Sequence, residues 1–366
     1  MATGIPLTVL TGFLGSGKTT LLKRLLDDPA MAGTAVVINE FGEVGIDDAL
    51  VEKVDDDAVL LPSGCICCAV RGDLIDALEK MHTKSLWGDI PPMRRVVLET
   101  TGLADPTPIV HTLMTEERLF RIYQLDGVVT TVDAQLGLSQ IDQHFEPAKQ
   151  IAIADRLVVT KSDVADRDAV SRLETRLRAL NRAAPILRAV KGDIPASELI
   201  GLGAHEPAIT DADPENWLAA DKYAAPAHDH DHDHGHRHDH DHAHDCAGES
   251  CTHPDHHHGH LHGIQSFCLT FPDPLDGSEL SNALQLLAQL YGGKLLRVKG
   301  IVNVKDQPQP FVIHGVQHIF YPPDTLQRWP GDKRESRLVF ITKDLSETVL
   351  RRHFKPFLGE ALGAAA

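Results

Sequence analysis

An eight-residue motif near the N-terminus constrains the fold of this chain more than any other feature. Residues 12–19 read Gly-Phe-Leu-Gly-Ser-Gly-Lys-Thr, between a strand expected over Leu7 to Leu10 and a helix expected from Thr20 to Leu26. In this context the pattern GxxxxGK(S/T) indicates a phosphate-binding loop, because glycine backbone N–H groups and a helix N-terminus attract phosphate oxygens. The residues expected to bind the phosphates are Gly12, Gly15, Ser16, Gly17, Lys18, Thr19 and Thr20.

From Pro6 to about Gly201, short β-branched runs alternate with helical stretches. This alternation is typical of an α/β domain with a mostly parallel sheet. The clearest helix is predicted over Val164 to Leu180, with Asp163 near its cap. Strands are predicted at Leu7 to Leu10, Thr34 to Asn39, Val96 to Glu99, Gly127 to Val132, Arg156 to Lys161 and Ile186 to Ala189.

The periodicity ends at about Ala204 and returns at Ile264, which divides the chain into three parts. We expect a P-loop domain over 1–203, a flexible His/Asp-rich linker or loop over 204–263, and a smaller α+β domain over 264–366. The elements predicted in the last part are strands at Ile264 to Phe271, Leu295 to Val304, Phe311 to Val316 and Arg337 to Thr342, and helices at Gly277 to Tyr291 and Leu345 to Phe354.

The charge balance of the 366 residues restricts the partners. Thirty-five Lys and Arg against 52 Asp and Glu give a net charge of −17. Such a charge repels phosphodiester backbones and anionic membrane surfaces, so nucleic acid and membrane are excluded as main partners. No apolar run reaches the roughly 18 residues of a spanning helix, and no signal segment precedes the first strand. The sequence therefore predicts a cytoplasmic protein.

Two motifs at strand ends indicate what the loop binds. Thr160-Lys161-Ser162-Asp163 follows a predicted strand, where Asp163 would accept hydrogen bonds from guanine and the Lys161 stem would cover the base. A cap for the next helix is the alternative explanation for Asp163.

Glu99-Thr100-Thr101-Gly102 ends another predicted strand. Glu99 would hold Mg²⁺ directly or through water, together with the Thr19 hydroxyl, and Gly102 would meet the γ-phosphate. Lys18 and Glu99 are therefore the candidate catalytic residues. An ordinary strand-to-loop turn is the alternative for this motif.

Three of the six cysteines, Cys65, Cys67 and Cys68, lie within four residues. Three thiolates suit Zn²⁺ or a similar ion, and the spacing lacks the CxxC of a redox pair. One ligand of a tetrahedral site is missing, and Glu43, water or a partner would supply it.

Histidine is concentrated in a single tract. His228 to His262 holds 15 of the 22 histidines, interleaved with Asp and with two further cysteines. Neutral imidazoles beside acidic residues bind several ions weakly, so the tract is expected to be a metal reservoir; a solvated polar linker is the alternative.

The segments TGFLGSGKTT, INEFGEVGIDD, SGCICC, ETTGLADP and TKSD, with LLRVKGI at 295–301, resemble the CobW-like GTPases, relatives of the nickel-inserting GTPases of urease and hydrogenase. The resemblance implies a GTP-hydrolysing metal chaperone, chiefly for zinc and in one branch for cobalt in cobalamin synthesis. It implies that residues 39–45 and 99–102 are the two switches and that the three cysteines bind the transported ion. It also implies a client metalloprotein and leaves a homodimer open.

The sequence thus predicts a GTPase that binds GTP, Mg²⁺ and Zn²⁺ and passes zinc to a client. Intrinsic hydrolysis is expected to be slow, because no residue is evident as a catalytic arginine or a water-orienting glutamine. The alternatives are a cobalt chaperone, a zinc buffer or storage protein, and a small-molecule P-loop kinase, which the TKSD motif disfavours.

Overall fold

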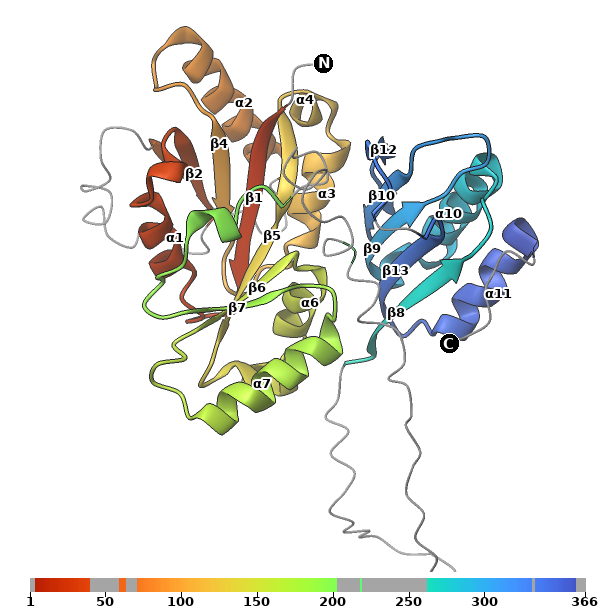
Figure 1. The fold of residues 1–366 in the computed structure, drawn as a ribbon. Helices are drawn as coiled ribbons and strands as arrows, with labels where there is room; N and C mark the ends of the chain where they lie inside the picture. The colour runs from red at the N-terminus through yellow and green to blue at the C-terminus, as the bar shows by residue number, and fades with distance from the viewer. Residues whose placement is uncertain are drawn as a thin grey trace, which may run out of the picture.

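The structure is a computed structural model that describes residues 4–39, 59–63, 71–202, 218, 262–330 and 333–359. These residues form two bodies that lie side by side, an α/β domain followed by a smaller α+β domain (Figure 1). This arrangement confirms the predicted fold class. Within the described ranges, every helix is too short or too polar to cross a membrane.

The first domain is built on a seven-stranded sheet in the order β3-β2-β4-β1-β5-β6-β7, and all of its strand pairs are parallel. The strand sequences are nearly continuous apolar runs, which is the pattern expected of parallel strands that are buried on both faces. The strands are β1 (Ile5–Gly12), β2 (Thr34–Asn39), β3 (Val59–Ser63), β4 (Arg95–Glu99), β5 (Tyr123–Asp133), β6 (Arg156–Thr160) and β7 (Ile186–Ala189).

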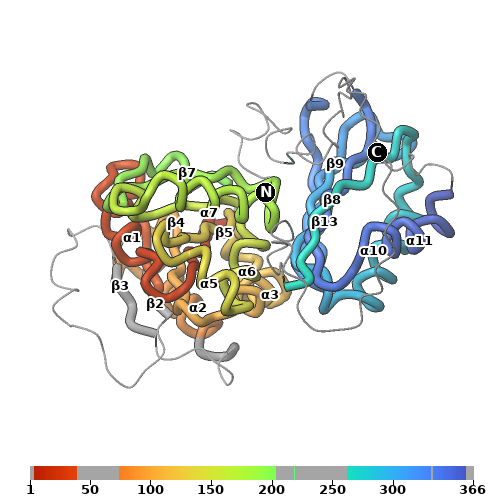
Figure 2. Tube along the Cα trace, turned by 90° about the horizontal axis from the view of Figure 1, so that it is seen from below, coloured from red at the N-terminus to blue at the C-terminus, as the bar shows by residue number. Residues whose placement is uncertain are grey.

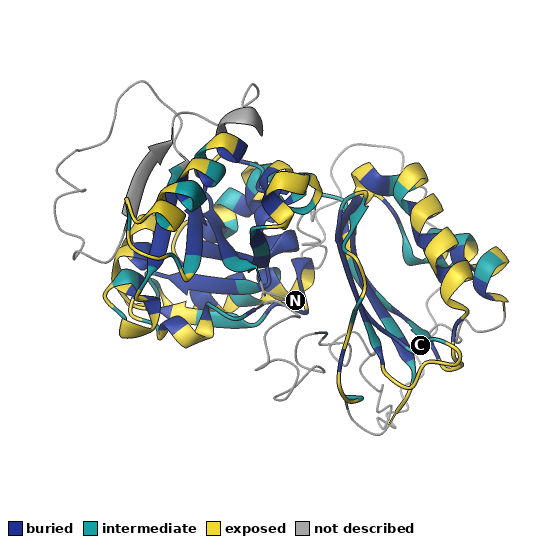
Figure 3. Cartoon of the chain, turned by 90° about the horizontal axis from the view of Figure 1, so that it is seen from above, coloured by how far each residue is buried: buried dark blue, intermediate teal, exposed yellow. Residues whose placement is uncertain are grey.

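Helices cover both faces of this sheet. One apolar cluster joins α1 to one face, and a larger cluster joins the other helices to the opposite face. Figure 3 shows the strands buried between helices whose outer surfaces are exposed. The helices are α1 (Lys18–Leu26), α2 (Arg71–Trp87), α3 (Thr107–Thr115), α4 (Glu117–Phe120), α5 (Gly137–Gln143), α6 (Phe145–Ile153) and α7 (Arg167–Leu180).

Several elements of this domain differ from the prediction. Strand β5 begins at Tyr123 and not at Gly127, and α1 begins at Lys18 and not at Thr20. Strand β3 was not predicted; it follows an acidic stretch and contains a proline, so it lacks a strand pattern of its own. Helix α7 begins at Arg167 and not at Val164, with Asp166 at the N-cap position. The residues before it form a turn in which Val164 N donates to Lys161 O, so Asp163 is not the cap of this helix.

The second domain is an antiparallel sheet, covered on one face by α10 and α11 (Figure 2). Strands β11 and β12, of two residues each, were not predicted, and α11 continues past the predicted end despite Pro356. The elements are β8 (Ile264–Phe271), α10 (Gly277–Tyr291), β9 (Leu295–Val302), β10 (Phe311–Val316), β11 (Ile319–Phe320), β12 (Asp324–Thr325), β13 (Ser336–Lys343) and α11 (Glu347–Leu358).

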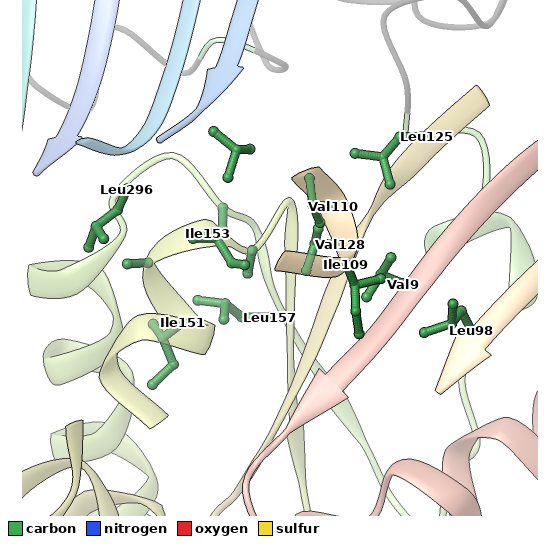
Figure 4. Close-up of a cluster of buried hydrophobic side chains, with 14 of the residues drawn as sticks. Val9, Leu98, Ile109, Val110, Leu125, Val128, Ile151, Ile153, Leu157 and Leu296 are labelled. Carbon is green, nitrogen blue, oxygen red and sulfur yellow. The ribbon is translucent and has the colours of Figure 1, made fainter. Parts of the chain in front are cut away.

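The other face of this second sheet packs against the first domain. Leu296 and Ile341 belong to the same buried cluster as the core of the α/β domain. Figure 4 shows Leu296 on the side of that core where Ile151 and Ile153 of α6 lie. Both faces of the second sheet are therefore covered, which explains why every residue of β9, including Arg297 and Lys299, is buried.

Candidate nucleotide site

The P-loop is shaped by three glycines with positive φ angles. Gly15 has φ +72°, and Gly17, at the N-cap of α1, has φ +90°. Other residues adopt such angles only with strain, so the backbone conformation of the loop requires glycine at these positions. Gly12, with φ +144°, is required for a second reason as well, because a Cβ there would lie 2.3 Å from Thr131 Oγ1. Lys18 Nζ donates to Gly12 O at 3.0 Å and Phe13 O at 3.2 Å, which holds the ammonium over the loop.

Thr19 and Glu99 meet at the end of the sheet. Thr19 Oγ1 donates to Glu99 Oε1 at 2.7 Å, and Glu99 is only 5% exposed. A hydroxyl and a buried carboxylate are hard oxygen ligands of the kind that Mg²⁺ binds, so the donor set fits this ion. The structure brings these two sequence-predicted residues together.

The loop after β4 lies directly on the P-loop. Thr100 N donates to Leu10 O at 2.9 Å, and a Cβ at Gly102 would lie 2.6 Å from Leu14 N. Gly102 therefore touches the phosphate-binding loop through its backbone, and any larger residue would push the two loops apart.

Gln150 of α6 fixes this second loop from behind. Its Nε2 donates to Gly102 O at 3.1 Å and to Ala104 O at 3.0 Å. One residue earlier on the same helix, Lys149 Nζ pairs with Asp105 Oδ2 at 2.5 Å. The helix thus holds residues 102–105 of the segment that follows Glu99.

The end of β6 is tied to the P-loop by two side chains. Thr160 Oγ1 donates to Ser16 O at 2.7 Å, and Lys161 Nζ donates to Gly15 O at 2.7 Å. Lys161 Nζ also pairs with Asp133 Oδ2 at 2.6 Å, at the end of β5. Asp163 lies exposed in the turn that follows. Thr160 and Lys161 of the predicted guanine motif therefore contact the P-loop directly, whereas Asp163 lies outside these contacts.

Sequence reasoning missed Asp133, Thr131 and Gln150. Asp133 is the last residue of β5, so the rule that polar side chains at the carboxyl ends of parallel strands line the ligand site would have found it. Thr131, which contacts Ser16 Oγ at 2.7 Å, lies two residues earlier on that strand. Gln150 gives no such signal, because it is one polar residue on an otherwise apolar helix face.

The predicted metal ligands lie largely outside the described residues. The predicted zinc ligands outside the described residues are Glu43, Cys65, Cys67, Cys68 and His228 to His260. His262 is described, and its Nε2 contacts Ile141 O at 2.6 Å, so that ring nitrogen is engaged within the fold. Within the ranges that the structure covers, no group of three or more His, Cys, Asp or Glu side chains is placed to hold a metal ion.

Comparison with protein families decides the classification. The CobW/HypB/UreG nucleotide-binding domain matches residues 6–188, and the cobalamin synthesis protein cobW C-terminal domain matches residues 264–358. The chain belongs to the CobW/HypB/UreG family. It is a P-loop GTPase, and the family, the fold class and the enzyme class predicted from its sequence are confirmed.

Relatives of this CobW-family GTPase match nearly all of its length. The zinc chaperone YjiA of Escherichia coli is 33% identical over 352 residues, which cover 96% of this chain and 98% of YjiA. The zinc chaperone CobW of Pseudomonas aeruginosa is 27% identical, with coverage of 97% and 92%. The crystal structure of Zn(II)-bound YjiA GTPase superposes with a TM-score of 0.66 at 29% identity, over 97% of this chain and 99% of that one.

Proposed function

We propose that this GTPase is a zinc metallochaperone that uses its nucleotide cycle to control the transfer of zinc to a client metalloprotein. The observation that carries the proposal is the contact between the P-loop and the segment after Glu99. Because Gly102 lies against Leu14, a change at the γ-phosphate is transmitted directly to residues 100–105. Zinc is proposed as the metal because two relatives that match nearly the whole chain are named zinc chaperones.

Each nucleotide-site residue has a role in this proposal. Lys18 and the backbone of Gly12 to Thr20 bind the phosphates, and Lys18 stabilises the charge that develops during hydrolysis. Lys161 covers the guanine base, and Asp163 accepts the guanine N1–H and exocyclic amine. The cap alternative for Asp163 has lost its support, because Asp166 stands at the N-cap of α7.

Mg²⁺ would be held by Thr19 and Glu99, whose oxygens meet at the end of β4. When bound, this ion neutralises charge on the β- and γ-phosphate oxygens. Glu99 would orient it through a carboxylate fixed by burial, and Thr19 would complete the pair.

Slow intrinsic hydrolysis is part of the proposal. Gln150 and Gln140 both donate to loop carbonyls, Gln140 to Leu14 O at 3.4 Å. Their amides therefore position the loops, and neither is committed to orienting a water molecule. We expect the client to accelerate turnover.

The zinc site is proposed at Cys65, Cys67 and Cys68, with Glu43 as a candidate fourth ligand. The topology of the described strands supports this location. Strands β2 and β3 are parallel neighbours with Asn39 opposite Ser63, and β2, β4 and β1 run the same way. Residues 40–58 and 64–70 are thus attached, at Asn39 and at Ser63, to the edge of the sheet where β1 leads into the P-loop.

The histidine tract is proposed to be a reservoir over His228 to His260, since His262 is engaged by Ile141 O. Deleting residues 229–261 keeps that contact and should lower the number of zinc ions bound per chain, counted by native mass spectrometry. An unchanged count would contradict the reservoir.

Several finer features complete the proposal. Domain boundaries at 203/204 and 263/264 enclose both matched family domains. A cytoplasmic location follows from the clustered thiols, which stay reduced in that compartment. Cobalt remains the alternative cargo, although the intrinsic affinity order favours Zn²⁺ over Co²⁺ for such ligands.

The test is GTP turnover by metal-stripped protein with and without stoichiometric Zn²⁺, in the parent and in a Cys65/Cys67/Cys68 triple Ser variant. We expect zinc to change the rate in the parent and not in the variant. A rate indifferent to zinc in the parent would contradict the chaperone and favour a zinc buffer.

A further inference from the structure

Two histidines face each other across the boundary between the domains. His111 lies on α3 of the GTPase domain, and His318 lies in the turn between β10 and β11 of the second domain. Their Nε2 atoms are 3.2 Å apart, and their ring centroids are 5.0 Å apart at an interplanar angle of 49°. The contact is accessible to solvent, because His318 is exposed and His111 half-buried.

The turn that carries His318 is built to hold it in place. Val316 pairs with Ile319, so Gln317 and His318 form a two-residue hairpin turn, in which Gln317 has φ +54°. The Cβ of His318 lies over Gly292, where an added Cβ would be only 2.5 Å away. A side chain at Gly292 would therefore displace His318 from its position opposite α3.

Thr115, one turn further along α3, favours one tautomer of His111. Thr115 Oγ1 donates its single proton to His111 O at 2.9 Å. Its contact with His111 Nδ1, at 3.4 Å, must then use an oxygen lone pair, which favours a proton on Nδ1. Nε2 of His111 accordingly presents a lone pair toward His318. A second partner that fixes the distal nitrogen is the usual arrangement for a histidine that binds metal.

The separation of the two nitrogens matches a shared ion. Two nitrogens bound at 2.0–2.1 Å to one tetrahedral Zn²⁺ lie about 3.3 Å apart. A straight N–H···N hydrogen bond along both ring axes would place the centroids further apart than the observed 5.0 Å, so the two nitrogens converge at an angle. We propose that His111 and His318 form a second zinc site, which bridges the two domains and is separate from the cysteine cluster.

Two protein ligands define what such a site does. The remaining positions on the ion are filled by water, so binding is weaker and exchange faster than at a four-ligand site. Because one ligand comes from each domain, a bound ion joins α3 to the β10–β11 turn. The site is therefore suited to zinc in transit, and its occupancy strengthens the contact between the domains.

The test is histidine modification by diethyl pyrocarbonate in the full chain, with free Zn²⁺ fixed by a chelator buffer at pH 7.5. Peptide mass spectrometry gives a separate rate for each histidine. We expect zinc to slow the modification of His111 and His318 at least fivefold, with one common midpoint, while His82 and His144 are unaffected. Unchanged rates at His111 and His318 would overturn the proposal.

Reciprocal variants test whether one ion is shared. In His318→Gln, zinc should no longer protect His111, and in His111→Gln it should no longer protect His318. Protection of either histidine that persists without the other would overturn the bridging site. The same measurement in the triple Ser variant should show unchanged protection, since this site does not depend on the thiolates. Loss of protection there would assign the effect to the cysteine site. Equal zinc-free melting temperatures verify that the variants fold.

Discussion

At the scale of single residues, the nucleotide site depends on side chains that hold loops together as much as on those expected to touch GTP. Thr160 is the clearest case. It opens the predicted guanine motif, and its hydroxyl donates to Ser16 O at 2.7 Å from a buried position. The P-loop is therefore fixed to β6 through one hydroxyl group.

Replacing Thr160 by valine keeps the shape and removes this hydroxyl. An unsatisfied buried carbonyl costs about 1–3 kcal/mol. We expect GTP to bind roughly tenfold more weakly, since each 1.4 kcal/mol is a factor of ten. Titration with a fluorescent GTP analogue measures the change, and Thr160→Ser, which keeps the hydroxyl, should bind like the parent. Parental affinity in Thr160→Val would contradict this role.

Glu99→Gln separates charge from shape at the other end of the site. The amide oxygen still accepts the Thr19 hydroxyl, so the fold should be unchanged, but the negative charge that would hold Mg²⁺ is lost. We expect turnover to fall about a hundredfold or more and the Mg²⁺ concentration for half-maximal rate to rise. Steady-state rates across a Mg²⁺ titration check both effects. A variant with the parental Mg²⁺ midpoint would show that Glu99 does not hold the ion.

At the scale of secondary structure, α6 connects two parts of the molecule. One side of the helix holds the loop after β4 through Gln150 and Lys149. The same helix packs against β9 of the second domain, where Leu296 joins the core beside Ile151. The loop after β4 and the second domain are therefore both in contact with α6.

Gln150→Leu tests the first half of this connection. The substitution removes both donations and leaves the buried carbonyls of Gly102 and Ala104 unsatisfied, a loss of about 2–6 kcal/mol of local stability. We expect faster hydrogen exchange over residues 100–105, measured by mass spectrometry. Gln140→Leu, which removes one long and more exposed contact to Leu14 O, should have little effect there. Equal exchange in both variants would show that Gln150 does not fix the loop.

The sequence predicted elements well wherever hydrophobic periodicity and a local boundary signal coincided. Strand β2 and helix α10 have the predicted bounds; the latter begins after Asp276, whose carboxylate caps it by accepting from Ser278 N and Glu279 N. Strand β3 escaped prediction because its pairing with β2, and not its own composition, makes it a strand. The predicted start of α7 was wrong. Lys161 has a left-handed backbone conformation, and the turn that begins there places the first residue of the helix at Arg167.

The same limit applies to the candidate site. Gly12 to Thr19, Glu99 and the Thr160 to Asp163 motif could be proposed from the sequence, because each belongs to a local pattern at the end of a predicted strand. Their mutual contacts required the strand order, and Asp133 and Gln150 act only through residues distant in sequence. The role of each residue in GTP and metal binding remains a prediction.

At the scale of the whole molecule, a buried ionic cluster joins the two domains. Asp155, which is 4% exposed, accepts two hydrogen bonds from Arg297 Nη2 and pairs with Lys299 Nζ at 2.6 Å. Burial alone would raise the pKa of Asp155. The charges of Arg297 and Lys299, the hydrogen bond from Lys299 and that from Val128 N outweigh this effect and hold the pKa well below its ordinary value.

Asp155→Asn should lower the free energy of unfolding by about 3–5 kcal/mol, because it leaves two buried cations without their carboxylate. Asp142→Asn, at an ion pair whose carboxylate is 50% exposed, should cost under about 1 kcal/mol. Urea unfolding at neutral pH measures both. Similar losses in the two variants would contradict the importance of the buried cluster.

The lowered pKa also predicts a pH dependence. In the unfolded chain Asp155 takes up a proton near its ordinary pKa of about 3.9, whereas in the folded protein it stays ionised to lower pH. Its contribution to stability is thus complete above that range and is lost as the pH falls below it. The stability difference between the parent and Asp155→Asn should therefore narrow as the pH falls below about 4. Urea unfolding across this range checks it, and a difference that widens in acid would contradict the assigned direction.

The central claim is that the nucleotide cycle controls zinc binding at the cysteine site. The most direct measurement is the zinc affinity of the protein lacking residues 229–261, by chelator competition, in its GDP form and in a form bound to a non-hydrolysable GTP analogue. A coupling of about 1–3 kcal/mol predicts zinc affinities that differ by roughly 5- to 150-fold between the two nucleotide states. In the triple Ser variant, zinc binding at this site should be lost in both states. Equal zinc affinities in the two nucleotide states would contradict the account.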